Sequence, residues 1–133
     1  MVGLSVMIVK DGKILLGKRK SSHGTGEFAF PGGHIEYMES FEGCIFREVQ
    51  EETALEIKNI RFLHIANVKE YFPKHYVHLS FVADWAGGEW KVLEPEKCES
   101  WGWYEFDNLP SPLFATVQMT VQSYKTGKNF YDA

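Results

Sequence analysis

The sequence has few of the features that mark membrane, disulfide-rich or nucleic-acid-binding proteins. Its two cysteines, Cys44 and Cys98, are far apart and match no metal-ligand spacing, so we expect reduced thiols in a cytoplasmic protein. Fourteen lysines and arginines are outnumbered by 18 aspartates and glutamates, and this net charge of −4 provides no broad basic surface for a nucleic acid polymer. The apolar stretch 1–9 is too short to span a bilayer and lacks a basic leader, so we expect no membrane association.

Apolar residues are nevertheless plentiful enough for one hydrophobic core. Hydrophobic residues make up 44% of the 133-residue chain and aromatic residues 15%. Since a chain of this length forms a single core most readily, and since no repeat or linker interrupts it, we expect one domain over 1–133.

Alternating apolar residues and turn signals predict a chain rich in strands. Lys10-Asp11-Gly12 is a hairpin signal, and Pro73 interrupts a later apolar region. The expected strands are 4–9, 13–16, 28–30, 57–66, 68–72, 76–83 and 99–104, and a last helix is expected over 113–124. His75 and His78 are three residues apart on one strand and so face opposite ways, which argues against a shared metal.

Three glutamates cluster near the end of another expected helix. Glu51 and Glu52 follow Glu48 by three and four positions, so the three carboxylates share one helix face. Two such charges roughly 5 Å apart repel by about 0.8 kcal/mol in water and by about 3 kcal/mol at an effective dielectric of 20. A divalent cation would remove this repulsion, and hard carboxylate oxygens suit Mg²⁺ or Mn²⁺.

A solvated, glutamate-rich helix face is the alternative explanation, and it is the commoner one for an arbitrary Glu-x-x-Glu-Glu pattern. Two features favour a site here. Phe41, Cys44 and Leu55 fall on the same helical sector as Glu48, so the carboxylates border the buried stripe. The Gly32-Gly33 pair upstream permits a close backbone approach that an ordinary helix entry does not need. On these grounds alone, both explanations stay open.

The spacing of these residues resembles the Nudix box. Over residues 33–55 the chain has all but one of the motif's defined positions, namely Gly33, Glu39, Arg47, Glu48, Val49, Glu51, Glu52 and Leu55. The exception is Ala54, which stands where the family normally has glycine. Because glycine is the residue best suited to the end of a helix, we expect the alanine to strain or reshape the C-cap.

The resemblance implies a fold, a reaction and a cofactor. The fold would be an α/β/α sandwich with a mixed β-sheet between helices. The enzyme would hydrolyse diphosphates linked to nucleosides or related groups with Mg²⁺, for which Mn²⁺ could substitute. Glu48 and Glu52 would be the main metal ligands, Glu51 a third and the Gly33 carbonyl a fourth.

The resemblance also assigns supporting roles. Glu39 and Arg47 would brace the loop, helix and loop of the motif as an ion pair. The general base is left open: it would be a glutamate of the helix or one of the downstream residues Glu99 and Glu96.

Matches outside the motif narrow the expected substrate. Segments 16–20, 31–34 and 93–101 look like a subgroup that includes nucleotide diphosphatases acting on thiopurine nucleoside triphosphates, whereas marks of the ADP-ribose branch are not evident. The subgroup implies a homodimer and the release of nucleoside monophosphate and pyrophosphate from a small nucleotide. Its substrate-binding residues would be Lys18, Arg19, Gly32 and Gly33.

Each of these substrate assignments has an alternative. Lys18 and Arg19 would otherwise belong to a solvated strand end, although a guanidinium is well suited to grip phosphate oxygens. Phe28, Tyr71 and Phe72 could stack on a base or pack in the core. Rival functions are hydrolysis of another Nudix substrate, such as a dinucleotide or a pterin triphosphate, and a regulatory nucleotide-binding domain without catalysis.

Overall fold

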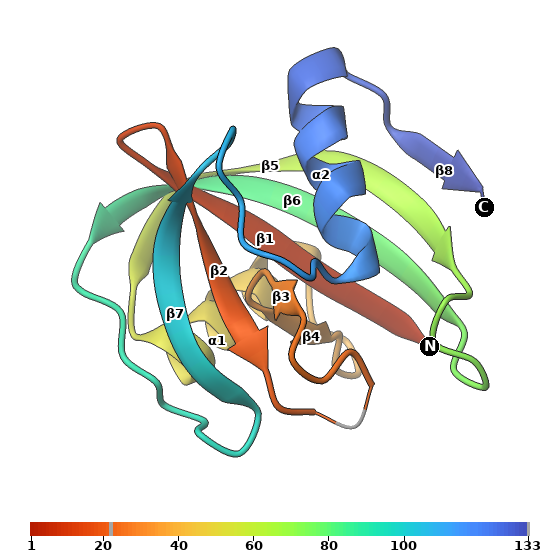
Figure 1. The fold of residues 1–133 in the computed structure, drawn as a ribbon, viewed down its shortest axis with the longest axis horizontal. Coiled ribbons are helices and arrows are strands. Elements are labelled where there is room, and N and C mark those ends of the chain that lie inside the picture. Colours follow the sequence, from red (N-terminus) through yellow and green to blue (C-terminus); the bar gives the residue numbers. More distant parts are fainter. Residues whose placement is uncertain (22, 133) are drawn as a thin grey trace.

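A computed structural model of the chain describes residues 1–21 and 23–132 (Figure 1). The segment 21–26 is rich in serine and glycine, which predicts a loop, and its Ser22 lies outside the described residues. In chain order the elements are β1 (Val2–Lys10), β2 (Lys13–Arg19), β3 (Phe28–Ala29), β4 (Gly32–His34), α1 (Phe41–Thr53), β5 (Glu56–Val68), β6 (Tyr76–Gly87), β7 (Cys98–Glu105), α2 (Ala115–Thr126) and β8 (Phe130–Asp132).

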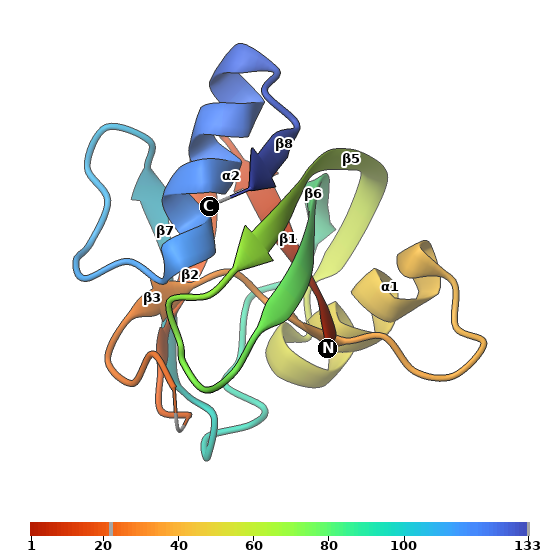
Figure 2. The same ribbon diagram turned by 90° about the vertical axis from the view of Figure 1, so that its right-hand side faces the viewer.

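The strands form one mixed sheet between the two helices. Its order is β3-β2-β1-β6-β5-β8, with β4 also paired to β1 and β7 to β2. The β1–β6 and β5–β8 pairs are parallel and the others antiparallel. Figure 2 shows α1 and α2 on opposite faces of this sheet. The expected α/β/α sandwich with a mixed sheet is confirmed.

Each helix covers its own hydrophobic cluster. Leu4, Val6 and Ile8 of β1 pack in the cluster under α1, whereas Met7 packs in the cluster under α2. Successive side chains of a strand point to opposite faces, so a central strand covered on both sides must be apolar at almost every position. This requirement explains why β1 reads as a continuous apolar run.

The first hairpin forms as its turn residues predict. Lys10 pairs with Lys13, and Asp11 and Gly12 both have positive φ, at 49° and 77°. Two positive φ angles in a two-residue loop match the right-handed twist of the flanking strands. The prediction of a hairpin through Asp-Gly is confirmed.

In the second half of the chain one strand prediction is wrong and one strand was not predicted. The strand expected over 68–72 is instead the end of β5 followed by a turn, in which the Lys74 amide donates to the Tyr71 carbonyl at 2.8 Å. The aromatic residues there have high strand propensity, but Pro73 offers no amide for a sheet. The sequence also gave no signal for β8, whose three residues pair in parallel with β5.

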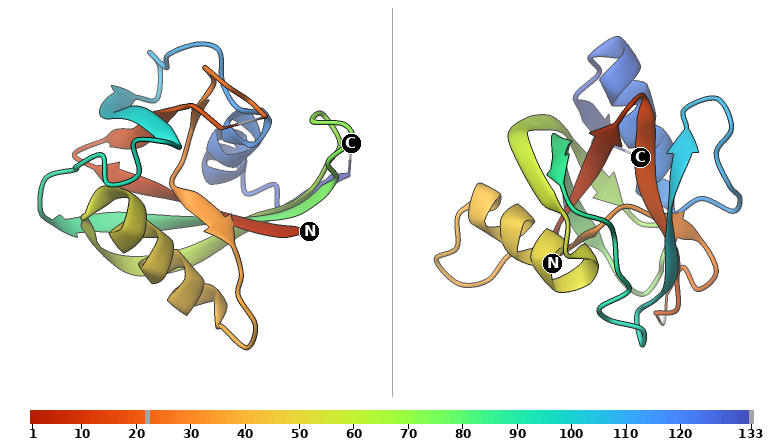
Figure 3. Two further views of the ribbon diagram at one scale, coloured as in Figure 1. Left: turned by 90° about the horizontal axis from the view of Figure 1, so that it is seen from below. Right: turned by 90° about the vertical axis from the view of Figure 1, so that its left-hand side faces the viewer.

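Helix α1, the gold helix in Figure 3, is bounded by two well-defined caps. The Ser40 hydroxyl accepts a hydrogen bond from the Gly43 amide at 3.0 Å, as an N-cap serine does. The helix ends at Ala54, whose φ of 64° lies in the left-handed region. The expectation of a strained C-cap at Ala54 is confirmed.

Replacing Ala54 with glycine is expected to stabilise the fold by about 1 kcal/mol. The left-handed conformation costs an L-residue about 1–2 kcal/mol, and the greater chain entropy of glycine offsets part of the gain. Thermal unfolding should show a rise of about 3 °C. Ala115→Gly, at the regular first residue of α2, is the control and should lower the midpoint. Equal losses in both variants would show that Ala54 is not strained.

Candidate active site

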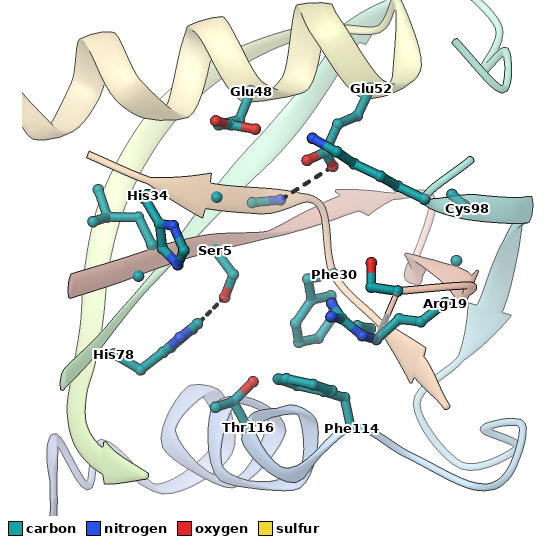
Figure 4. A pocket seen from close by; sticks show the side chains of 18 of the residues that line it. Ser5, Arg19, Phe30, His34, Glu48, Glu52, His78, Cys98, Phe114 and Thr116 are labelled. Carbon is teal, nitrogen blue, oxygen red and sulfur yellow. Dashed lines mark hydrogen bonds between the residues drawn. The ribbon is translucent and has the colours of Figure 1, made fainter. Parts of the chain in front are cut away.

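A cleft of about 430 Å³ opens between α1 and α2 (Figure 4). Glu48 and Glu52 on α1 line one side, and Phe114 and Thr116 at the start of α2 line the opposite side. Residues of β1, β4 and β6 form the wall between them. Two chemically different ends, one with paired carboxylates and one with the Phe114 ring, therefore share one cavity.

The acidic end contains two adjacent carboxylates. Glu52 Oε2 accepts a hydrogen bond from the Gly32 amide at 3.3 Å. Burial raises the pKa of Glu52 well above its usual value, and the neighbouring Glu48 carboxylate raises this pKa further. Among the described residues, Glu48 forms an ion pair with Arg47 and Glu52 forms none.

The two glycines of β4 permit two close approaches, of α1 at Gly33 and of β1 at Gly32. A Cβ atom built on Gly33 would lie 2.4 Å from the Glu48 carboxylate, and one on Gly32 would lie 2.1 Å from the Leu4 carbonyl oxygen. Neither glycine has a positive φ. Space, and not backbone conformation, therefore favours glycine at both positions. The obstacle is backbone at Gly32 and the end of the Glu48 side chain at Gly33, so the predicted close approach is present.

Arg47 braces the acidic helix against the loop before it. Its Nε donates to Glu39 at 2.7 Å, its Nη1 to Glu48 at 2.7 Å and to Glu51 at 3.3 Å, and its Nη2 to the His34 carbonyl at 3.2 Å. The hydrogen bond from Arg47 lowers the pKa of Glu39 to about 2. Glu39 and Arg47 lie side by side, in the arrangement expected of a structural ion pair.

Three other glutamates differ in their relation to the cleft. Glu51 is half exposed, points to Arg47 and does not line the cavity. Glu99 is held by Lys18 at 3.5 Å and, like Glu96, is not among the lining residues. Glu94, which the sequence analysis did not select, does line it, and burial raises the pKa of its carboxyl. Neither Leu93 before it nor Pro95 after it indicated that Glu94 would line the cleft.

Arg19 lies in the cleft wall, toward the end that contains Phe114. Its Nε donates to the His23 carbonyl at 3.1 Å, and its guanidinium lies 4.5 Å from the centre of the Phe114 ring. Burial lowers the pKa of Arg19. Lys18 also lines the cavity. In this structure Arg19 therefore contacts an aromatic ring and a loop carbonyl at the end of the cleft away from α1 (Figure 4).

The aromatic residues in the cleft are not those considered from the sequence. Phe28, Tyr71 and Phe72 are absent from the lining, and Phe72 is 90% exposed. Tyr71 instead stacks against Phe114 with ring centres 4.6 Å apart. The aromatic rings lining the cavity are those of Phe30, Tyr76, Trp101 and Phe114.

Comparison with known proteins decides the family. The profile of the NUDIX domain matches residues 1–122, which is most of the chain. The chain belongs to the Nudix family. It is a Nudix hydrolase of the MutT-like kind, so the family and enzyme class inferred from the sequence are confirmed.

Individual Nudix relatives point to several substrates. The chain is 34% identical over 129 residues to an ADP-ribose pyrophosphatase from Methanocaldococcus jannaschii, covering 96% of this chain and 75% of the relative. It is 37% identical over 105 residues to the NAD-capped RNA hydrolase NudC of Pseudomonas putida, covering 79% of this chain but 36% of that protein. Neither is named for thiopurine nucleotides, so these relatives do not show the expected subgroup.

A solved structure has the same fold over nearly its whole length. The MutT NUDIX hydrolase from Burkholderia pseudomallei superimposes with a TM-score of 0.86 at 32% identity, covering 92% of this chain and 95% of that one.

In the described part of this chain, no helix is long and apolar enough to cross a membrane.

The acidic end of the cleft fits the divalent cation that Nudix hydrolases generally use. Across residues 1–21 and 23–132, no three His, Cys, Asp or Glu side chains gather in metal-binding geometry. Mg²⁺, however, is usually held by one or two carboxylates, with water and substrate phosphate as its other ligands. The adjacent Glu48 and Glu52 carboxylates provide such a pair, and the glycine at position 33 leaves Glu48 room beside the backbone.

Proposed function

We propose that this Nudix hydrolase cleaves nucleoside triphosphates to nucleoside monophosphate and pyrophosphate with Mg²⁺. The observation that carries the proposal is the single cleft joining the Glu48–Glu52 pair to an end with an aromatic ring at Phe114. A nucleotide has the same polarity, with phosphates at one end and a flat heterocycle at the other. The cleft volume of about 430 Å³ falls in the range of small-molecule sites.

The acidic end would hold the cation and the phosphates. Glu48 and Glu52 are the proposed main ligands, with the Gly33 carbonyl beside them. Glu51 stays the proposed third ligand, because it shares their helix face, although Arg47 holds it in this structure. A bound Mg²⁺ neutralises phosphate charge and acidifies a coordinated water.

The proposed general base is Glu94. Its carboxyl lines the cleft, and burial raises its pKa toward the range in which a carboxylate works well as a base. Glu99, the candidate named from the sequence, is tied to Lys18 outside the lining. Comparing Glu94→Gln with Glu99→Gln distinguishes the two residues, because loss of the base lowers kcat with little change in KM.

ADP-ribose hydrolysis is the second candidate function. It is supported by the Methanocaldococcus jannaschii relative, which is named an ADP-ribose pyrophosphatase. The same acidic end would then hold a diphosphate with a sugar attached on each side. Lys18, which lines the cleft, favours the triphosphate, because a terminal phosphate would give this cation an anionic partner that ADP-ribose lacks. Arg19 does not bear on this choice, because it contacts Phe114 at the other end.

A substrate panel with product analysis tests the proposal. Guanosine and adenosine triphosphates, ADP-ribose and NADH would be incubated with Mg²⁺, and the products followed by phosphorus NMR. The proposal expects monophosphate and pyrophosphate from the triphosphates at the highest kcat/KM. A preference for ADP-ribose would establish the second candidate, and release of nucleoside diphosphate with orthophosphate from the triphosphates would contradict the first.

Millimolar Mg²⁺ is expected to stabilise the protein against thermal unfolding. A ligand that binds the native state alone adds about 2.7 kcal/mol at a hundredfold excess over its dissociation constant. Melting in EDTA and in Mg²⁺ would be compared for the wild type and for Glu52→Gln. Coincident melting curves for the wild type would mean that the native protein binds no Mg²⁺ at these concentrations.

A further inference from the structure

A row of three residues forms a notch in the cleft wall. Gly3 of β1 pairs directly with His34 of β4 on one side and with His78 of β6 on the other. Cross-strand partners share a sheet face, so two imidazoles flank a position that has no side chain. All three residues line the cleft, and Figure 4 shows both histidines beside it.

The notch exists because residue 3 is glycine. A Cβ atom built there would lie 3.5 Å from His78 Nδ1 and 3.9 Å from His34 Cδ2. These are ordinary van der Waals distances, and Gly3 has no positive φ. An alanine would therefore fill the notch without displacing the backbone.

One wall of the notch can form hydrogen bonds. His78 Nε2 lies 2.8 Å from the Ser5 hydroxyl, and Figure 4 shows this pair spanning the cleft wall. Burial, with a smaller effect from His64, lowers the pKa of His78 to about 3, so the imidazole is neutral. A neutral imidazole has one donor and one acceptor nitrogen, and a hydroxyl can do either. The pair can therefore present Nδ1 as a donor or as an acceptor.

The other wall is flat and aromatic. The His34 ring lies 6.0 Å from the Tyr76 ring at an interplanar angle of 25°. Tyr76 is held in turn by a hydrogen bond of 3.0 Å between its hydroxyl and His23 Nε2. Stacked rings of this kind suit the face of a planar heterocycle.

We infer that the notch over Gly3 holds the heterocyclic base of the nucleotide. The His78–Ser5 pair then forms a hydrogen bond with the edge of that base, as a donor to a carbonyl or as an acceptor from an amino group. The inference rests on the proposed function, and it applies equally to a nucleoside triphosphate and to ADP-ribose. It assigns base recognition to Gly3, Ser5 and His78, none of which is a proposed metal ligand, and it predicts tolerance of both guanine and adenine.

Binding of fragments separates the notch from the acidic end. Guanosine and adenosine monophosphates in EDTA report on the base, whereas pyrophosphate with Mg²⁺ reports on the acidic end; calorimetry measures both. The variants are Gly3→Ala, which fills the notch, and His78→Leu, which removes its hydrogen bond. His75→Leu is the matched control, because His75 is exposed, outside the cleft lining and bonded to Asn67 on the surface.

The wild type should bind both monophosphates with affinities within about tenfold of each other. Gly3→Ala and His78→Leu should each weaken monophosphate binding at least tenfold and change pyrophosphate binding less than twofold, while His75→Leu changes neither.

If His78→Leu does not fold, Gly3→Ala alone tests whether the notch holds the base. Unchanged monophosphate binding in Gly3→Ala, equal weakening of both probes, or no monophosphate binding by the wild type would overturn the inference. Failure of the proposed function is a separate result, seen as no turnover of the substrate panel by the wild type.

Discussion

Replacing Glu52 with glutamine is expected to lower kcat at least about a hundredfold while leaving the fold intact. Loss of a partner one shell away from a metal costs 10- to 100-fold, and loss of a direct ligand should cost no less. The amide keeps the shape of the side chain and can still accept the hydrogen bond from the Gly32 amide. Steady-state kinetics at saturating Mg²⁺ provide the measurement.

The same substitution should stabilise the metal-free protein. Two carboxylates a few ångströms apart in a partly desolvated site repel by about 1–3 kcal/mol, and glutamine removes one of the charges. Chemical denaturation in EDTA at pH 7 measures the change in the free energy of unfolding. Opposite effects on activity and stability would distinguish a metal ligand from a residue that simply supports the fold.

The stability gain should depend on pH with a predictable sign. Because burial and Glu48 raise the pKa of Glu52 above its ordinary value of 4.5, the folded protein binds more protons than the unfolded chain above that pH. The contribution of Glu52 to the free energy of unfolding in EDTA should therefore be most favourable at or below about pH 4.5. It should be lost as the pH rises through the raised pKa. Glu52→Gln should flatten this dependence.

Glu42→Gln is the matched control for these experiments. Glu42 lies on the same helix, in its exposed first turn, and the substitution changes the net charge by the same amount. It should leave kcat, stability in EDTA and the pH profile close to those of the wild type. Near-normal kcat in Glu52→Gln would contradict the assignment of Glu52.

Gly33→Ala is the second substitution with a large expected effect. The new Cβ would lie 2.4 Å from the Glu48 carboxylate, which Arg47 holds at 2.7 Å on its other side. Since the carboxylate is the end of a flexible side chain and must move away, we expect a loss of activity of about a hundredfold but a loss of stability of only about 1 kcal/mol. Kinetics and denaturant unfolding measure the two losses.

A double-mutant cycle identifies the cause of the stability loss. If the alanine acts by colliding with Glu48, then Gly33→Ala should cost less than about 0.5 kcal/mol in a Glu48→Ala background. An equal cost in both backgrounds would mean that the new methyl group collides with something else. Activity is not informative in this background, because Glu48→Ala removes a proposed ligand.

Local sequence signals predicted the parts of the fold that depend on neighbouring residues. Asp11-Gly12 predicted a hairpin, and Ala54 predicted a strained helix end. Each signal depends on backbone geometry within a few residues. The short β8 has no such signal, because its place depends on pairing with β5, more than sixty residues earlier in the chain.

The candidate site shows the same division between local signals, which the sequence carries, and contacts between distant segments, which it does not. The spacing of Glu48 and Glu52 on one helix face is a local property, and so is the closeness of Gly33 to that helix. The cleft positions of Glu94 and of the Ser5–His78 pair are not, because they depend on how distant strands and loops meet. Likewise, the turn of Arg19 toward Phe114 depends on where α2 begins.

Binding of Mn²⁺, followed by electron paramagnetic resonance, tests most directly whether Glu48 and Glu52 form a metal site. The wild type should take up Mn²⁺ at neutral pH, and Mg²⁺ should compete for the same site. Glu48→Gln and Glu52→Gln should each weaken the binding at least tenfold, whereas Glu42→Gln should leave it unchanged. Unchanged Mn²⁺ affinity in both glutamine variants, or no uptake by the wild type at millimolar Mn²⁺, would contradict the assignment.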